Sequence, residues 1–459
     1  MTPIAPEPAS APQAENLSRR PQQAGPPPPG QRTQRDRLLD ALIELASETG
    51  YQAVTITQLS SRAGVSSATF YELFEGKEDC LLAAYRALAA RVYGDLQSAM
   101  AGGALSDVLP SALDGLLRSV RDEPDAARLL FIEALAGGPR LREEIKRQLG
   151  DFERQTEMFL DAQTPDSATL DLPAIAIVGA VRSIVARHLR THSEDLLPAL
   201  RDDMLAWMNA YAVEPGERRW SSGANARLPR RRYSEPVPPQ LPRLPRGRHG
   251  LPASVVARSQ RIRILHGTAE VMLAKGYAEA TVADIVAAAG VARETFYQHF
   301  TDKQDAFLEA QQYPTQYILD TCVASYFSQE EWPARVWTGL KTLLELITQN
   351  PAESHLRLVE CYAASPAAAR RAEEITRSFT IFLEEGYRCR PEARSLPRLF
   401  SQTIAGAVFE VIQRAIARGD IGEVPRCLPQ LSYLAIAPFT GPREAIRLLE
   451  EMRADPASG

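Results

Sequence analysis

Two segments of the chain, residues 55–77 and 281–303, carry polar side chains at matching positions that suit binding rather than bond-making chemistry. A lysine at the start of a helix can meet a phosphate oxygen, which fits Lys77 and Lys303. Arginine and glutamine, as at Arg293 and Gln298, can each form two hydrogen bonds with one base edge. The candidate contact residues are Thr55, Ser66, Ser67, Ala68, Thr69, Tyr71, Glu72 and Lys77 in the first segment, and Thr281, Arg293, Glu294, Thr295, Tyr297, Gln298, His299 and Lys303 in the second.

These positions match because the chain contains one unit twice. Residues 34–82 align without gaps to residues 260–308, at an offset of 226. A weaker match continues further along, pairing Glu133 with Glu360, and Gly179-Ala180-Val181 with Gly406-Ala407-Val408. Such an internal repeat predicts two homologous units, each of about 200 residues.

Within each copy the pattern predicts two short helices joined by a tight turn. Thr55 opens the first helix as part of a capping box, and Gly64 ends it, because glycine permits a positive φ angle. Ser66 can cap the second helix, on which Phe70 and Phe74 lie one turn apart and face inward. Its outer face then carries Ser67, Ala68, Tyr71 and Glu72. This arrangement indicates a helix-turn-helix, with a packed corner of two helices as the alternative.

The remainder of the chain predicts an all-α protein divided by two compositional breaks. Long amphipathic segments, at 141–161, 174–191, 368–386 and 399–417, are poor in strand signals. The predicted organisation is a disordered proline-rich tail at 1–33, a helix-turn-helix domain at 34–82, a helical regulatory domain at 83–213, a basic proline- and arginine-rich linker at 214–257, a second helix-turn-helix domain at 258–308 and a second regulatory domain at 309–455.

Positive charge is concentrated just upstream of each repeated segment. The arginines concerned are Arg32, Arg35 and Arg37 before the first copy, and Arg243, Arg246, Arg248, Arg258, Arg261 and Arg263 before the second. Arms in these places could follow a nucleic-acid backbone or enter a minor groove. For the stretch from Arg227 to Arg248, a solvated linker explains the same composition equally well.

Composition excludes several other classes of protein. The net charge of −5 does not by itself favour nucleic acid. The five cysteines are scattered without metal-ligand spacing, which predicts reduced, buried thiols in a cytoplasmic protein. His188 and His192 are four residues apart but have no third ligand nearby, so we expect a surface pair and no metal. No catalytic motif or membrane span is present. We therefore expect a soluble non-enzyme without a cofactor.

The second half is also rich in aromatic residues. They are Tyr313, Tyr317, Tyr326, Phe327, Trp332, Trp337, Tyr362, Phe379 and Phe382. These side chains could line an apolar ligand pocket, and ordinary core packing explains them equally well.

Both repeated segments resemble the DNA-binding domain of the TetR/AcrR family of transcription regulators. The first copy supplies Thr55, Ala63-Gly64-Val65-Ser66, Thr69, Tyr71, Phe74, Lys77 and Leu82, and the second Thr281, Ala289-Gly290-Val291, Thr295, Tyr297, His299, Phe300 and Lys303. Two positions depart from the family pattern. Leu73 stands where the family often has histidine, and Ala292 replaces the capping serine.

The resemblance implies a regulator, a repressor by analogy, that binds a double-stranded DNA operator and responds to an apolar small molecule. By analogy, the paired Thr69/Thr295, Tyr71/Tyr297 and Lys77/Lys303 would contact phosphates, while Ser67-Ala68 and Arg293-Glu294 would face bases. Helices around 174–212 and 399–437 would form an intramolecular pseudo-dimer, with a homodimer of fused chains as the alternative. A helical ligand-binding or scaffold protein with vestigial helix-turn-helix units is the competing hypothesis.

Overall fold

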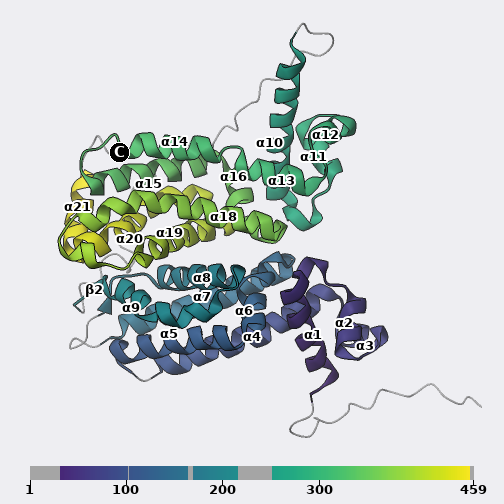
Figure 1. Ribbon diagram of the computed structural model, residues 1–459, viewed down its shortest axis with the longest axis horizontal. Helices are drawn as coiled ribbons and strands as arrows, with labels where there is room; N and C mark the ends of the chain where they lie inside the picture. The colour runs from purple at the N-terminus through teal and green to yellow at the C-terminus, as the bar shows by residue number, and fades with distance from the viewer. Residues whose placement is uncertain (1–31, 102, 164–168, 215–250, 455–459) are drawn as a thin grey trace, which may run out of the picture.

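The computed structural model describes residues 32–101, 103–163, 169–214 and 251–454, which are almost entirely helical. The two halves of the chain lie one above the other, and each carries a small group of short helices at the same end of the molecule (Figure 1). No helix in these ranges combines the length and the apolar character needed to cross a bilayer. Residues 1–31 of the predicted tail and residues 215–250 of the predicted linker lie outside the described residues.

The first half consists of α1 to α9 with short connecting elements. Their bounds are α1 Gln34–Thr49, η1 Tyr51–Ala53, α2 Ile56–Ala63, α3 Ser67–Leu73, α4 Lys77–Met100, α5 Leu105–Asp122, α6 Pro124–Phe131, η2 Glu133–Ala136, α7 Pro139–Asp161, α8 Ala174–Arg190, η3 Glu194–Leu200 and α9 Arg201–Asn209. Two short antiparallel strands pair in this half: β1 Thr169–Leu170, between α7 and α8, and β2 Ala212–Val213, after α9.

The second half repeats this order with more breaks. Its elements are α10 Ala253–Glu279, α11 Val282–Ala289, α12 Arg293–His299, α13 Lys303–Gln312, α14 Thr315–Tyr326, α15 Trp332–Gln349, α16 Pro351–His355, η5 Leu356–Glu360, α17 Cys361–Ala364, α18 Pro366–Ser378, η6 Phe379–Arg388, η7 Glu392–Ser395, α19 Leu399–Ala417, η8 Ile421–Cys427, α20 Leu428–Thr440 and α21 Pro442–Ala454.

The all-α prediction is confirmed, and several predicted boundaries shift. Helix α10 begins at Ala253, so the last residues of the predicted linker are helical. Helix α4 continues from Lys77 to Met100, across the boundary placed at residue 82, because its apolar face packs on both domains. The segment predicted as one helix at 368–386 changes from α-helix to 3-10 helix at Phe379.

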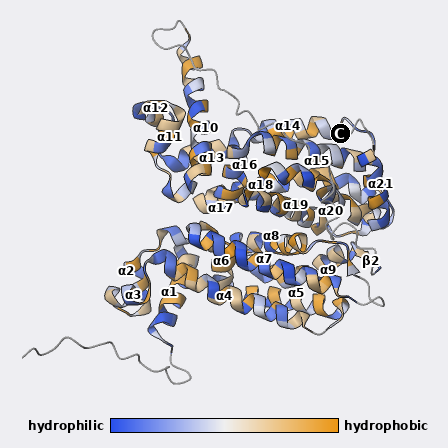
Figure 2. Ribbon diagram, turned by 180° about the vertical axis from the view of Figure 1, so that it is seen from behind, coloured by the Kyte–Doolittle hydropathy of each residue, from blue (hydrophilic) through white to orange (hydrophobic). Residues whose placement is uncertain are grey.

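The two halves pack on each other mainly through α8 and α19. Both ribbons are largely hydrophobic in Figure 2, and most of their residues are buried. A Cβ on Gly179 of α8 would lie 2.5 Å from Glu410 Cγ, and a Cβ on Gly406 of α19 would lie 2.6 Å from Ser183 Oγ. The two repeated glycines therefore let the helix backbones approach closely.

Further contacts extend this interface away from the glycine crossing. The Tyr211 hydroxyl donates a 2.7 Å hydrogen bond to the Leu434 carbonyl, and Arg414 pairs with Glu153 at 2.7 Å. One hydrophobic core runs from the first helix-turn-helix through both helical bodies, whereas α10 to α13 share a separate core with η5, α17 and α18. The regions predicted to form a pseudo-dimer thus meet within one chain.

Candidate nucleic-acid interface

The first helix-turn-helix is held by caps that its sequence predicts. Thr55 Oγ1 accepts from the Gln58 N–H while Gln58 Oε1 accepts from the Thr55 N–H, at 3.3 and 2.8 Å. Gly64 ends α2 in the left-handed region, at φ +63°. Ser66 then accepts from the Thr69 N–H at 3.0 Å and starts α3. These local bonds fix the angle at which α3 leaves the turn.

The second unit repeats this geometry with one weaker cap. Thr281 and Asp284 form a complete capping box, and Gly290 ends α11 at φ +61°. Helix α12 begins after Ala292, which provides no side-chain cap. Loss of an N-cap hydroxyl costs about 1 kcal/mol, so α12 depends more on tertiary packing than α3 does.

Packing of the second helix turns one face inward and the other towards solvent. Phe70 and Phe74 are buried with ring centroids 5.7 Å apart, and Phe296 and Phe300 repeat this pair at the same separation. The following tyrosines remain open to solvent, with 60% of Tyr71 and 49% of Tyr297 exposed. The residues expected to face bases are also exposed: Ser67, Ala68 and Glu72 on α3, and Arg293, Glu294 and Gln298 on α12.

Other candidate contact residues are more constrained than the sequence suggests. Thr55, Thr281 and Ser66 use their hydroxyls in caps, and Thr69 and Thr295 are half-buried. His299 is half-buried with its Nε2 3.4 Å from Gln260 Oε1, and burial together with the charge of Arg261 lowers its pKa. The exposed candidates whose side chains form no cap thus lie on α3 and α12, whereas Thr55, Ser66 and Thr281 are exposed but use their hydroxyls as caps.

The expectation that Lys77 and Lys303 are free to meet phosphates is wrong for this structure. Lys77 Nζ donates to the carbonyls of Tyr51, Gln52 and Val54 at 2.9–3.2 Å, and lies 4.5 Å from the Tyr51 ring centroid. Lys303 does the same with Tyr277 and Ala280. Burial lowers the pKa of both ammonium groups. In each copy the lysine therefore ties the segment that follows the first helix of the helix-turn-helix domain to the helix that begins with the lysine itself.

Three of the described upstream arginines, Arg35, Arg261 and Arg263, make contacts within the fold instead of forming free arms. Arg35 lies over the Phe74 ring, and Arg261 lies over the Phe300 ring while pairing with Glu309. Arg263 donates to the carbonyls of Ala289 and Gly290 at 2.6 Å, where α11 ends. Arg243, Arg246 and Arg248 lie outside the described residues.

A joint between each helix-turn-helix and its helical body was not predicted. Glu133 accepts from the Tyr51 N–H at 2.7 Å, and Glu360 accepts from the Tyr277 N–H at 2.8 Å. The alignment of Glu133 with Glu360 in the repeat was the sequence signal that could have revealed it. Of these two carboxylates, only Glu360 also forms an ion pair with a described residue of the other half, Arg142, at 3.0 Å.

The electrostatics of the two joints differ accordingly. Burial raises the pKa of Glu133 more than the hydrogen bond from the Tyr51 N–H and the charges of Arg190 and Arg128 lower it. Burial would likewise raise the pKa of Glu360, but the hydrogen bonds from His355 and Tyr277 and the charge of Arg142 bring it below its ordinary value. The Glu360 carboxylate, which accepts the hydrogen bond from the second helix-turn-helix, therefore has partners in both halves of the chain.

Other predicted features are placed as follows. Cys80, Cys322 and Cys361 are buried, whereas Cys389 is exposed, which corrects the expectation that all the thiols are buried. His188 is buried rather than on the surface, with Nδ1 2.9 Å from Ser193 Oγ. No group of potential metal ligands occurs in the described ranges.

Comparison with known proteins agrees with the two helix-turn-helix units. A family model described as "Bacterial regulatory proteins, tetR family" matches residues 38–84 and 264–310. The HTH-type transcriptional repressor KstR of Mycolicibacterium smegmatis is 33% identical over 95 residues, which cover 20% of this chain and 47% of that protein. An uncharacterized HTH-type transcriptional regulator, YerO of Bacillus subtilis, is 28% identical over 102 residues, 22% of this chain and 35% of that protein.

These matches span about half or less of the length of the curated relatives. Among solved structures, the fatty acid degradation regulator FadR from Bacillus halodurans aligns with a TM-score of 0.34 and 19% identity, covering 38% of this chain and 93% of that one.

Proposed function

The chain belongs to the TetR family of bacterial regulatory proteins and carries the family's DNA-binding domain twice, and from this premise we propose that it binds one DNA operator with both domains. In this proposal residues 34–82 and 258–308 each place one recognition helix, α3 or α12, in a major groove. The regulatory bodies at 83–213 and 309–455 hold the two helices at the spacing of successive grooves, ~34 Å. The chain acts as a repressor whose DNA affinity a small molecule controls.

The observation that carries the proposal is the pair of exposed recognition helices at one end of a single chain (Figure 1). Each helix presents a polar outer face, while its aromatic residues are buried beneath it. The tight α8–α19 contact supports a pseudo-dimer, because it joins the two regulatory bodies inside one polypeptide.

Small-molecule control is supported by the joints at Glu133 and Glu360. Each joint is a carboxylate, half-buried at Glu133 and buried at Glu360, that receives a backbone N–H from its DNA-binding domain. A change in the position of η2 or η5 is therefore passed to the start of the helix-turn-helix. Coupling between a ligand site and a DNA site is typically 1–3 kcal/mol.

A binding assay with DNA from upstream of the chain's own gene tests the proposal. The variants are Tyr71→Ala, Tyr297→Ala and the double substitution, measured by fluorescence anisotropy. We expect each single change to weaken binding and the double change to weaken it further, since each exposed tyrosine lies on its own recognition helix. Tyr317→Ala, at an equally exposed tyrosine on α14, is the matched control and should bind like the parent chain.

The competing hypothesis, a scaffold or ligand-binding protein with vestigial helix-turn-helix units, predicts a different result. Under it, neither upstream DNA nor a randomised pool is bound above the level of non-specific duplex. Loss of binding in only one of the two single variants would instead assign DNA binding to one domain.

A further inference from the structure

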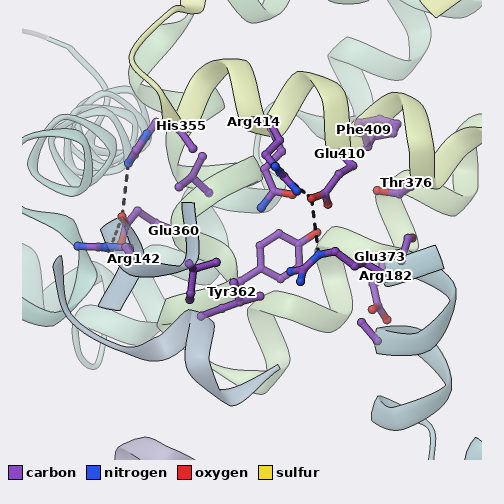
Figure 3. Close-up of a pocket in the computed structure, with 18 of the residues that line it drawn as sticks. Arg142, Arg182, His355, Glu360, Tyr362, Glu373, Thr376, Phe409, Glu410 and Arg414 are labelled. Carbon is purple, nitrogen blue, oxygen red and sulfur yellow. Dashed lines mark hydrogen bonds and ion pairs between the residues drawn. The ribbon is translucent and has the colours of Figure 1, made fainter. Parts of the chain in front are cut away.

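A large cavity lies between the two halves of the chain, away from both recognition helices. Its volume is about 680 Å³, within the range typical of sites for small organic ligands. Residues of α6, α7 and α8 line it from the first half, and residues of α10, η5, α17, α18 and α19 line it from the second. Figure 3 shows Arg142 and Arg182 of the first half pointing towards Glu360, Glu410 and Arg414 of the second.

The lining of this cavity is strongly cationic. It includes nine arginine and lysine residues but five glutamates. Several of the cations already have a carboxylate partner: Arg142 with Glu360, Arg190 with Glu373, and Arg414 with Glu410. The excess of positive charge therefore remains after these pairs are formed.

Two arginines from opposite halves carry much of that excess. Arg187 of α8 donates to the neutral Gln402 side chain, and Arg377 of α18 forms no ion pair in the part of the chain that the structure describes. Burial and the charge of Arg377 together lower the pKa of Arg187, so the two guanidinium groups repel one another. An anion between them would relieve this repulsion.

Buried donors near these arginines also lack acceptors. Arg190 is only 10% exposed in its side chain, and its Nε has no hydrogen-bond partner among the described residues. The same holds for Arg414 Nη2, and the nearest carboxylate oxygen to Arg182 Nε, that of Glu410, lies 3.9 Å away, beyond hydrogen-bond distance. A buried donor without an acceptor is destabilising, and more so when the group is charged, so these positions favour a ligand that supplies oxygens.

The cavity wall is apolar on another side, where Phe131, Leu135, Leu149 and Phe409 contribute. We propose that the cavity binds a small organic anion, a carboxylate or a phosphate ester with an apolar body, whose charged group is held by Arg187, Arg190 and Arg377. The proposed function includes control of DNA binding by a small molecule, and this proposal names the chemical class of that molecule. The effect of the ligand on DNA binding rests on the proposed function.

The ligand class differs from the purely apolar effector that the aromatic residues suggested. The cavity lined by Tyr326, Phe379 and Phe382 has a volume of only about 50 Å³, while Trp332 and Trp337 are buried and Tyr313, Tyr317 and Phe327 are exposed. Most of the nine aromatic residues therefore fill the core or face solvent, and of them only Tyr362 lines the large cavity. The roomier space is the charged one between the halves.

The position of the large cavity predicts which DNA-binding domain responds to a ligand bound there. Arg142 and Glu360 both line the cavity, and Glu360 receives the Tyr277 N–H of the second helix-turn-helix. An anion competes with Glu360 for the positive charge of the wall and so alters the joint of the second domain. The corresponding Glu133 does not line the cavity.

Calorimetry on the full chain without DNA tests the binding step. The probes are octanoate, octyl phosphate and neutral octanol, which share one apolar tail. We expect the full chain to bind at least one of the two anions, and to bind it more tightly than octanol. The double variant Arg187→Gln/Arg377→Gln should lower the affinity for that anion about tenfold or more, the loss expected for a charged hydrogen bond. It should leave the affinity for octanol unchanged.

Arg370→Gln is the matched control, because Arg370 is exposed on α18 and does not line the cavity. It should bind the probes like the parent chain, and circular dichroism should show all variants equally folded. If octanol binds as tightly as both anions, or if the double variant binds like Arg370→Gln, the proposal is overturned. Because no DNA is present, these results are independent of the test of DNA binding. The relative affinities of octanoate and octyl phosphate show whether the site prefers a carboxylate or a phosphate.

Discussion

Gly179 on α8 and Gly406 on α19 occupy equivalent places in the repeat, and each faces the residue four positions beyond the other. Gly179 lies against Glu410, and Gly406 lies against Ser183. The contact therefore has the reciprocal form of a two-fold dimer interface, although it lies within one chain.

Substitution of these glycines should weaken the contact between the halves. Gly406→Ala places its Cβ 2.8 Å from Ser183 Cβ, and we expect a loss of about 1–3 kcal/mol in the free energy of unfolding from overpacking. Gly115→Ala is the control, because nothing lies within 4 Å of a Cβ there in α5. It should be neutral or stabilising, since alanine favours a helix over glycine by about 0.5–1 kcal/mol. Equal effects of the two substitutions would argue against close packing at the crossing.

The mass in solution should be that of one chain. The helices expected to form a dimer interface, α8 and α19, already cover each other, and the mass of the chain is 50.5 kDa. Light scattering should therefore give a dominant species near this value. A dominant species of twice the mass would show that a further interface joins two fused chains.

The joint at Glu360 should contribute more to stability than the joint at Glu133. Glu360→Gln keeps an acceptor for the Tyr277 N–H but leaves Arg142 without its charged partner, so we expect a cost of about 1–3 kcal/mol. Glu133→Gln is the matched control. Its cost should be smaller, because burial raises the pKa of Glu133 and a neutral side chain avoids that penalty. Denaturant unfolding of both variants provides the comparison, and a larger cost for Glu133→Gln would contradict it.

Lys303→Ala should lower stability before it affects DNA contacts. The ammonium group donates to two backbone carbonyls at 2.7 and 2.9 Å and lies over the Tyr277 ring, so its loss should cost about 1–3 kcal/mol in unfolding free energy. Lys275→Ala removes an exposed ion pair with Asp284 and should cost about 1 kcal/mol or less. If Lys303→Ala unfolds like the parent chain but binds every DNA sequence less tightly, the lysine is a phosphate contact after all.

Local signals in the sequence account for most of the helix-turn-helix geometry. Capping boxes at Thr55 and Thr281 and the left-handed glycines Gly64 and Gly290 depend on neighbours within a few residues, so their spacing alone predicts them. The inward face at Phe70 follows from helical periodicity in the same way.

Features that depend on distant residues could not be predicted in this way. Lys77 looks like a free cation at a helix start, because the carbonyls it binds come from residues 51–54, which are brought to it by tertiary folding. The cavity is assembled by α8 and α18, which are nearly 200 residues apart in the chain. Repetition in the sequence indicated that two units exist, but not which charged residues would meet between them.

Base recognition should be unequal between the two halves of the operator. On α12, Arg293 is exposed and can form two hydrogen bonds with guanine, a contact worth ~1–3 kcal/mol of discrimination. The equivalent residue on α3 is Ser67, which can discriminate less. Arg293→Ala should therefore relax the preference at one position of one half-site, whereas Ser67→Ala should change little. Selection of bound sites from a randomised pool measures both. The parent chain should return an imperfect palindrome with most information in the half read by α12, and a perfect, equally informative palindrome would instead mean that a homodimer uses one motif from each chain.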